Sequence, residues 1–409
     1  MKYELKNINW IDCIFIPTDS NSTTIEIWVK AGSNYETKEE NWISHLLEHM
    51  LFKWWKKYKT PKEVSEIIDN IWWEMNAYTS REKTWYYIKT ASEYIETSID
   101  VLSDIFVYPN FDKKELEKEK LVVLQELKMW QDDPYKLLYN KFMWYYYWNS
   151  NAYWRTIIWT EKNIKNFTQE DLIKYKNSLY TKDNIVIVVS WKIDNQVKLE
   201  KMIKEKFNDL PKNKTKEKQK FKWINAKKHK DFYKKWLEQN HLIMWIPSFS
   251  VKNNNSYIVD LIWVILWWNM SSILFQEVRE KLWLCYYIWS SNYTNQEDWI
   301  LLINAWIDKN NFDKWIKKIN EILDNFQNWN ITIEQLEKAK NYLIWSSKIW
   351  LETSNSIAWY MINSYINNNW KIETIEEYIE KIKKISLIDI KNISRKIFWK
   401  ENRYLYYLD

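Results

Sequence analysis

Glycine is nearly absent from this chain, with one residue in 409. Globular proteins average about 7% glycine, which would give about 29 in a chain of this length. Tight turns and the C-terminal ends of helices need a positive φ, which glycine reaches freely and a bulky side chain does not. The chain therefore lacks the residue that the turns of a folded protein need most.

The chain also has few cysteines and no long apolar run, which argues against a disulfide framework and against a membrane-spanning helix. The two cysteines, Cys13 and Cys285, provide no disulfide framework, which favours a reducing compartment. The longest apolar stretch, residues 257–268, is interrupted by Asp260 and is too short to span a membrane. The first residues lack the apolar core of a signal peptide. We therefore expect a cytoplasmic protein that does not associate with membranes.

The charge balance is moderate. The net charge is +6, with 28% charged and 46% hydrophobic residues, which is typical of a globular protein. Lysines mostly alternate with glutamates, as on solvated helix faces, so we do not expect nucleic-acid binding. A chain of this length should form two or three domains with substantial cores.

Tryptophan is as abundant as glycine is scarce: there are 31 tryptophans, and the two types together number 32. Many stand where a turn or helix end would need glycine, as Trp191 does after the β-branched run 185–189 and Trp370 does in an Asn-rich turn. Other such positions are Trp72, Trp73, Trp267, Trp268, Trp283 and Trp329. We predict that most are glycine in the natural protein, encoded by UGA triplets that were read as tryptophan. Trp28, inside an expected strand, suits tryptophan better than glycine.

A polar, basic segment, residues 210–222, divides the chain near its middle. The expected elements follow a similar order on both sides: strand, helix, strand pair, helix, long charged helix, and a closing helix and strand. We therefore expect an α+β protein of two homologous domains, residues 1–209 and 223–409, joined by a linker at 210–222. Each domain would be a mostly antiparallel sheet covered by helices, and the two would face each other across a cleft.

The chain has four histidines, and two of them stand four residues apart in His45-Leu46-Leu47-Glu48-His49. Positions i and i+4 share a helix face, so both imidazoles can hold one Zn²⁺. Glu48 lies beside them, where a carboxylate can take a proton from zinc-activated water. The alternative is a helix with two incidental histidines and a surface glutamate. The rarity of histidine in this chain favours the metal site.

A catalytic zinc needs a third protein ligand and an open position for water. Glu119 and Glu126 are seven residues apart, so they share a helix face, and that face adjoins the apolar run 121–124. Carboxylates at a buried edge need a cation, which zinc would supply. Glu115 and Glu117 fit exposed positions on a charged helix better.

These motifs resemble those of the pitrilysin/insulinase family of zinc peptidases. The resemblance is greatest to the single-unit branch that contains the catalytic subunit of the mitochondrial processing peptidase. It covers nearly the whole chain, and its zinc motif is highly specific. The family typically has glycine at the places of Trp42 and Trp54, which independently supports recoding. The runs that carry the resemblance are residues 31–36, 41–54, 72–82, 122–126 and 270–280.

Carried over residue by residue, the resemblance makes His45, His49 and Glu126 the zinc ligands. It makes Glu48 the general base, and Glu119 a carboxylate that supports the ligands without certainly touching the metal. The second half has residues 271–275, Ser-Ser-Ile-Leu-Phe, where the first half carries its histidines. One zinc per chain follows from this difference.

The resemblance also implies how a peptide is held. Asn76 and Ala77 would lie on an edge strand that pairs with the substrate backbone. Arg279 and Tyr286 would reach across the cleft toward the scissile carbonyl, with Tyr286 as an oxyanion donor. The alternative for this pair is ordinary packing and a surface ion pair.

The implied activity is zinc-dependent endoproteolysis of unfolded peptides or processing sites. The implied assembly is a homodimer, or a heterodimer with an inactive paralogue. One rival is a catalytically silent member that serves as a scaffold or partner subunit, although such members usually lose part of the metal site. A second rival is a truly Trp-rich aromatic binding protein. That chain would have bulky side chains at tight backbone positions, and we expect it to be insoluble.

Overall fold

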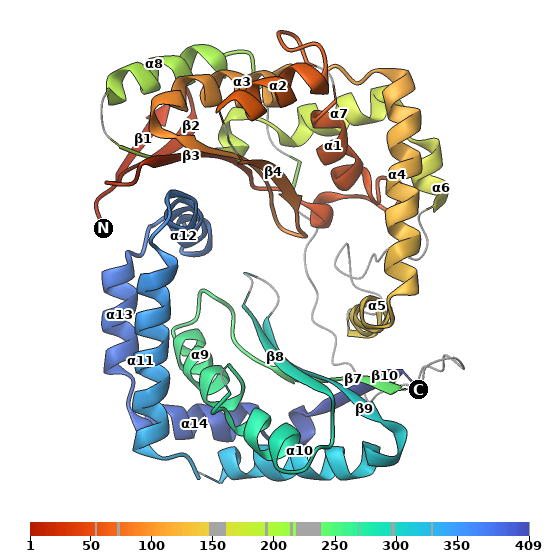
Figure 1. Cartoon of the computed structure of the whole chain (residues 1–409), viewed down its shortest axis with the longest axis vertical. Helices are drawn as coiled ribbons and strands as arrows, with labels where there is room; N and C mark the ends of the chain where they lie inside the picture. Colours follow the sequence, from red (N-terminus) through yellow and green to blue (C-terminus); the bar gives the residue numbers. More distant parts are fainter. Residues whose placement is uncertain are drawn as a thin grey trace. The chain divides into compact units, whose positions relative to one another are not determined.

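The computed structural model describes residues 1–53, 55–71, 74–146, 161–192, 195–212, 216–217, 239–268, 270–294, 296, 299–328 and 330–408. Most of the expected linker, and Trp54, Trp72, Trp73 and Trp329, lie outside these residues. The chain forms two compact units (Figure 1). Unit 1 contains Met1–Trp130, Tyr146–Ile224 and Leu351–Ile362, and unit 2 contains Gln131–Tyr145, Asn225–Trp350 and Asn363–Asp409. The division is not a single cut in the sequence, because each half contributes one short segment to the other unit.

Unit 1 is built on a six-stranded sheet with the strand order β1-β2-β6-β3-β5-β4. Neighbouring strands are antiparallel, except for the parallel pair β2 and β6. In β3, Ile25, Ile27 and Val29 face the apolar core, and Glu26 and Trp28 lie on the opposite face. The strands are β1 (Glu4–Ile8), β2 (Ile11–Pro17), β3 (Ser22–Val29), β4 (Glu74–Thr79), β5 (Thr84–Ala91) and β6 (Ile185–Trp191).

The helices of unit 1 are α1 (Ile43–Leu51), α2 (Pro61–Ile71), α3 (Ile95–Val107), α4 (Lys113–Asp132), α6 (Glu161–Asn166), α7 (Gln169–Leu179) and α8 (Gln196–Lys206). One face of the sheet packs against α3, and α8 packs beside α3 (Figure 1). The other face receives the start of α12 (Ser354–Asn367). Here the Ser354 hydroxyl hydrogen-bonds with the hydroxyls of Ser22 at 2.8 Å and Thr24 at 2.9 Å.

Unit 2 contains a four-stranded antiparallel sheet with the order β10-β7-β9-β8. Its strands are β7 (Gln239–Pro247), β8 (Tyr287–Thr294), β9 (Trp299–Asp308) and β10 (Tyr404–Leu408). Its other helices are α5 (Pro134–Tyr146), α9 (Asn255–Leu266), α10 (Phe312–Gln327), α11 (Ile333–Trp350), α13 (Ile375–Lys384) and α14 (Leu387–Ile397). Apolar residues of α9, α10 and α14 form the core with one face of the sheet. On the other face, Phe142 of α5 packs against Trp245.

The two units repeat one pattern. The order β6-β3-β5-β4 in unit 1 has the same succession along the chain as β10-β7-β9-β8 in unit 2. This repeat confirms the predicted α+β fold of duplicated, mostly antiparallel sheets. Unit 1 adds the hairpin of β1 and β2 at one edge, and the sequence analysis did not predict it. Within the described residues, no helix is long and apolar enough to cross a membrane.

The hairpin was missed because its turn is disguised. The two residues between β1 and β2, Asn9 and Trp10, have φ of 51° and 73°. Two-residue hairpins with positive φ at both positions strongly favour Asn-Gly, because the second residue needs glycine's freedom. Because tryptophan stands at the second position, the Asn-Gly pair, which is the strongest short-range hairpin signal, is absent from the sequence.

Candidate active site

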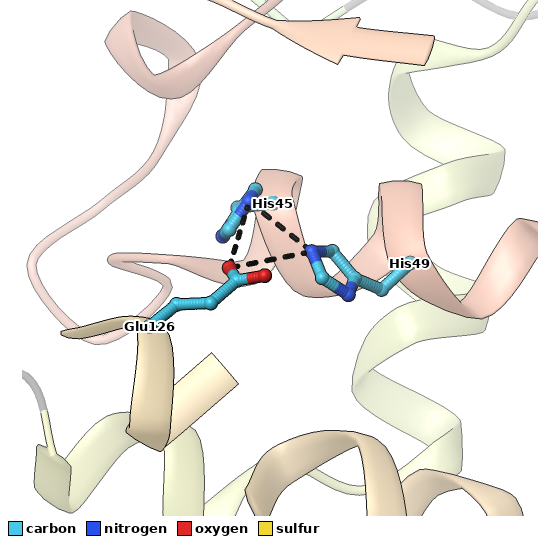
Figure 2. Close-up of side chains that lie close together, drawn as sticks. All are labelled: His45, His49 and Glu126. Atoms are coloured by element: carbon cyan, nitrogen blue, oxygen red, sulfur yellow. Dashed lines mark hydrogen bonds and ion pairs between the residues drawn. The ribbon is translucent and has the colours of Figure 1, made fainter. Parts of the chain in front are cut away.

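The two histidines of α1 lie one turn apart, and their Nε2 atoms are 3.2 Å from each other (Figure 2). Glu126 reaches them from α4. Its Oε2 atom lies 3.7 Å from Nε2 of His45 and 3.6 Å from Nε2 of His49. The structure therefore brings His45, His49 and Glu126 together, although they come from two helices separated by some 60 residues or more of chain.

This donor set fits a zinc ion. Zinc bonds of about 2.0–2.2 Å place tetrahedral donor atoms about 3.3–3.6 Å apart. The three measured separations, 3.2, 3.6 and 3.7 Å, lie close to that range. Two imidazoles and one carboxylate are also a typical catalytic zinc set, which keeps a fourth position open. In the described part of the chain, no other group of three or more His, Cys, Asp or Glu residues could hold a metal ion.

Glu119 supports the cluster by contacting the Nδ1 side of the His49 ring. Its Oε1 atom lies 2.7 Å from Nδ1 of His49, and its Oε2 atom lies 2.7 Å from Nζ of Lys53. Burial opposes the ionised carboxylate, but the hydrogen bonds from His49 and Lys53 outweigh it and lower the pKa of Glu119. An ionised Glu119 accepts the Nδ1 proton of His49, which leaves the Nε2 lone pair directed at the cluster.

Lys53 was not predicted by the sequence analysis. It lies just beyond the end of α1, four residues after His49, and pairs with the buried Glu119. The available signal was a basic residue one turn after the second histidine, together with a glutamate that was expected to be buried. That signal could not be used without knowing that α1 and α4 lie side by side.

The electrostatics of the two histidines differ. Burial, reinforced by the charge of His49, lowers the pKa of His45 to about 4, so this imidazole is neutral near pH 7, as a metal ligand must be. Burial also works against a charged His49, but the hydrogen bond with Glu119 and the charges of Glu126 and Glu48 raise its pKa. The carboxylates around His49 thus create a potential that attracts a cation.

Glu48 lies on α1 beside the two histidines. Burial raises the pKa of its carboxyl group. Two buried atoms, Oε2 of Glu48 and Nδ1 of His45, have no hydrogen-bond partner among the described residues. A carboxylate with a buried oxygen that lacks a partner and with a raised pKa is suited to accept and release a proton.

Strand β4 forms one edge of the unit 1 sheet and lies next to α1. Asn76 is exposed on this strand, and its side-chain oxygen accepts a hydrogen bond from the backbone N–H of Ala77 at 2.8 Å. An edge strand offers unpaired backbone groups to an extended peptide. The role of Asn76 and Ala77 in substrate binding stays a prediction.

Arg279 and Tyr286 lie in unit 2. The Arg279 guanidinium stacks over the Phe275 ring at 4.9 Å, and the Tyr286 side chain is 75% exposed. The backbone N–H of Tyr286 donates to the carbonyl of Trp306 in β9. The catalytic roles expected of this pair stay predictions.

Comparison with known proteins gives consistent matches along the chain. Residues 16–160 match the insulinase (peptidase family M16) domain, and residues 166–343 match the peptidase M16 inactive domain. The chain is 31% identical over 385 residues to the uncharacterised zinc protease YmxG of Bacillus subtilis (strain 168), covering 92% of this chain and 90% of that protein. It is 32% identical over 187 residues to the mitochondrial-processing peptidase subunit beta of Dictyostelium discoideum, covering 46% and 39%. The crystal structure of a protease from Helicobacter pylori has the same fold, with a TM-score of 0.91 at 21% identity and coverage of 100% and 99%.

Proposed function

The chain belongs to the insulinase family of peptidases (family M16), and on this premise we propose that it is a zinc-dependent metalloendopeptidase. The observation that carries the proposal is the convergence of His45, His49 and Glu126 beside Glu48. Relatives named zinc proteases support zinc as the metal of the family. We propose one zinc per chain, because these three residues are the one candidate cluster in the described ranges.

In this mechanism, His45, His49 and Glu126 hold the metal, and Glu119 orients His49. Zinc, when bound, would activate a water molecule and polarise the scissile carbonyl. Glu48 takes the proton of the attacking water and delivers it to the leaving amine. The raised pKa of Glu48 suits this exchange, because a base with a pKa nearer to neutral also returns the proton readily.

The substrate we propose is an unfolded peptide or an extended processing site. Its backbone would pair with the edge of β4 at Asn76 and Ala77, and strand pairing requires an extended chain. Arg279 and Tyr286 would stabilise the oxyanion. The assembly would be a homodimer or a heterodimer with an inactive paralogue. Dimerisation of the purified chain alone would support the first, and dimerisation only with the paralogue present would support the second. A cytoplasmic location stays a prediction.

The test uses a chain with glycine restored at the predicted positions and a labelled unfolded peptide. We expect cleavage that a zinc chelator abolishes and added zinc restores, and we expect a folded protein containing the same peptide sequence to resist. Cleavage that continues in the chelator would contradict a metal mechanism.

A second candidate is a catalytically silent subunit. The match of residues 166–343 to a domain described as inactive favours it. That match, however, contains none of His45, Glu48, His49 and Glu126, which all lie within residues 16–160. A silent subunit would bind zinc at this site and cleave no peptide.

A further inference from the structure

Helix α1, which carries both histidines, begins without a conventional cap. The residue at its N-cap is Trp42, with φ of 81°, and its side chain accepts no hydrogen bond from the helix. The first N–H groups of any helix have no acceptor within the helix, so they need one from elsewhere. At most helix starts a Ser, Thr, Asp or Asn side chain at the N-cap supplies that acceptor.

Glu36 supplies it here, from outside the helix. Its side chain is buried, with 1% of the residue exposed. Its Oε1 atom accepts from the backbone N–H of Ser44 at 3.0 Å. Its Oε2 atom accepts from the backbone N–H of Trp42 at 3.0 Å and from the side-chain amide of Asn41 at 3.1 Å. Both carboxylate oxygens therefore accept hydrogen bonds. Trp42 and Ser44 donate through their backbone N–H groups, so a glycine at position 42 could form the same bond.

Glu36 anchors the first turn of α1, which leads into the candidate metal site. Ser44 is adjacent to His45, and its hydroxyl hydrogen-bonds with the Tyr175 hydroxyl of α7 at 2.8 Å. The first turn of α1 is thus fixed by Glu36 through its backbone and by Tyr175 through a side chain. The donor separations at the cluster depend on how α1 is oriented relative to α4.

We infer that Glu36 is a positioning residue for the metal site: it fixes the start of α1, and thereby the approach of His45 to His49 and Glu126. This inference rests on the proposed function. Glutamine at position 36 keeps the size of the side chain but has one acceptor oxygen in place of two. It would leave Trp42 or Ser44 without an acceptor, and the turn before His45 would shift. Displacements of about 1 Å at a catalytic site can cost about 100-fold in rate.

The experiment compares Glu36→Gln and Glu36→Asp with Glu39→Gln, in the glycine-restored chain. Glu39 lies on the same loop and is exposed, so this control makes the same chemical change away from α1. Metal-free protein is titrated with Zn²⁺ against a competing chelator. It is also loaded with Co²⁺, whose visible spectrum reports ligand geometry. Peptide cleavage then gives kcat and KM separately, and the unfolding midpoint of the metal-free form measures stability.

For Glu36→Gln we expect the zinc dissociation constant to rise at least about tenfold, the cobalt spectrum to change, and kcat to fall while KM stays within about twofold. Glu36→Asp keeps both oxygens but has a shorter reach, so it should be intermediate, and Glu39→Gln should match the unchanged chain. If Glu36→Gln does not fold, the cobalt spectrum of folded Glu36→Asp decides. A zinc affinity and cobalt spectrum that are normal in each folded Glu36 variant would overturn the inference alone. Failure of the unchanged chain to bind zinc would overturn the proposed function, and this inference with it.

Discussion

Positive backbone φ angles identify individual tryptophans that do not suit their positions. Among the described residues, the non-glycine residues with positive φ are Asn9, Trp10, Trp42, Trp283, Asn369 and Trp370. Such a conformation costs a bulky residue about 1–3 kcal/mol, and glycine almost nothing. Trp283 is 80% exposed and Trp10 is 58% exposed, so little burial offsets that cost. Asn369 and Trp370 repeat the Asn-Trp pair of the first hairpin, where Asn-Gly would be expected.

The one glycine in the chain, Gly32, shows why some backbone positions need glycine. A β-carbon at Gly32 would lie 2.1 Å from the backbone oxygen of Ser80, which no side chain could avoid. The backbone N–H groups of Ser33 and Asn34 then donate to the carbonyls of Ser80 and Arg81. Gly32 thus allows the loop before α1 to dock on the turn between β4 and β5.

We predict that the natural protein carries glycine at positions 10, 42, 283 and 370. Peptide mass mapping of material from its source would measure this directly. Trp28 is the internal control, because it is fully buried and stacks on Trp85 with ring centroids 4.8 Å apart, and we expect it to be tryptophan. Tryptophan at all four positive-φ positions would refute recoding.

At the scale of elements, the sequence analysis predicted the helices and strands of the order that the two halves share, and it did not predict the amphipathic helices α2 and α13. The expected long charged helix of each half is α4 and α11, and the expected closing helix is α7 and α14. The helix α5 was missed, because its side chains are apolar and aromatic on several sides and give little 3.6-residue periodicity. The candidate metal ligands on α1 were predicted from a spacing that is local in the sequence, whereas Lys53 required knowledge of tertiary contacts.

A half-buried aspartate on α9 gives a pH-dependent test of this packing. Asp260 accepts a hydrogen bond from Asn292 of β8 at 2.8 Å, and burial raises its pKa to about 6. The folded state therefore holds this proton to a higher pH than the unfolded chain does. The stability that protonation contributes is present below about pH 4 and is lost as the pH rises to about 6.

Asp260→Asn keeps the acceptor oxygen and removes the charge. We expect this variant to be more stable than the parent above pH 6, by at most about 3 kcal/mol, and no more stable near pH 4. Urea unfolding at pH 4 and pH 7.5 measures both differences. An equal difference at the two values would show that the ionisation of Asp260 is not involved.

At the scale of the whole molecule, the difference between the two duplicated halves explains why the described residues contain one candidate metal site. The segment Leu116-Glu117-Lys118-Glu119-Lys120 of α4 corresponds to Leu336-Glu337-Lys338-Ala339-Lys340 of α11. The same alignment places Ser346 opposite Glu126. Glu119 and Ala339 are both buried, so the second unit keeps the packing position and lacks the carboxylate.

The sequence predicted the fold class and the repeated halves, because both depend on the order of elements. The order of elements did not, however, predict which chain segments belong to which unit. Leu351–Ile362 belongs to unit 1 and Gln131–Tyr145 to unit 2, and each segment directly follows a long helix. Even where such a segment is known to be helical, its local sequence carries no information about which sheet the segment will cover.

The proposed zinc peptidase activity is tested most directly by measuring zinc content and peptide cleavage on the same preparations of the glycine-restored chain and its Glu48→Gln variant. We predict one zinc per chain in both, with cleavage in the unchanged chain and a loss of at least about 100-fold in the variant, because in the proposed mechanism Glu48 transfers protons and does not hold the metal. Zinc-free protein, or undiminished cleavage by Glu48→Gln, would contradict the account.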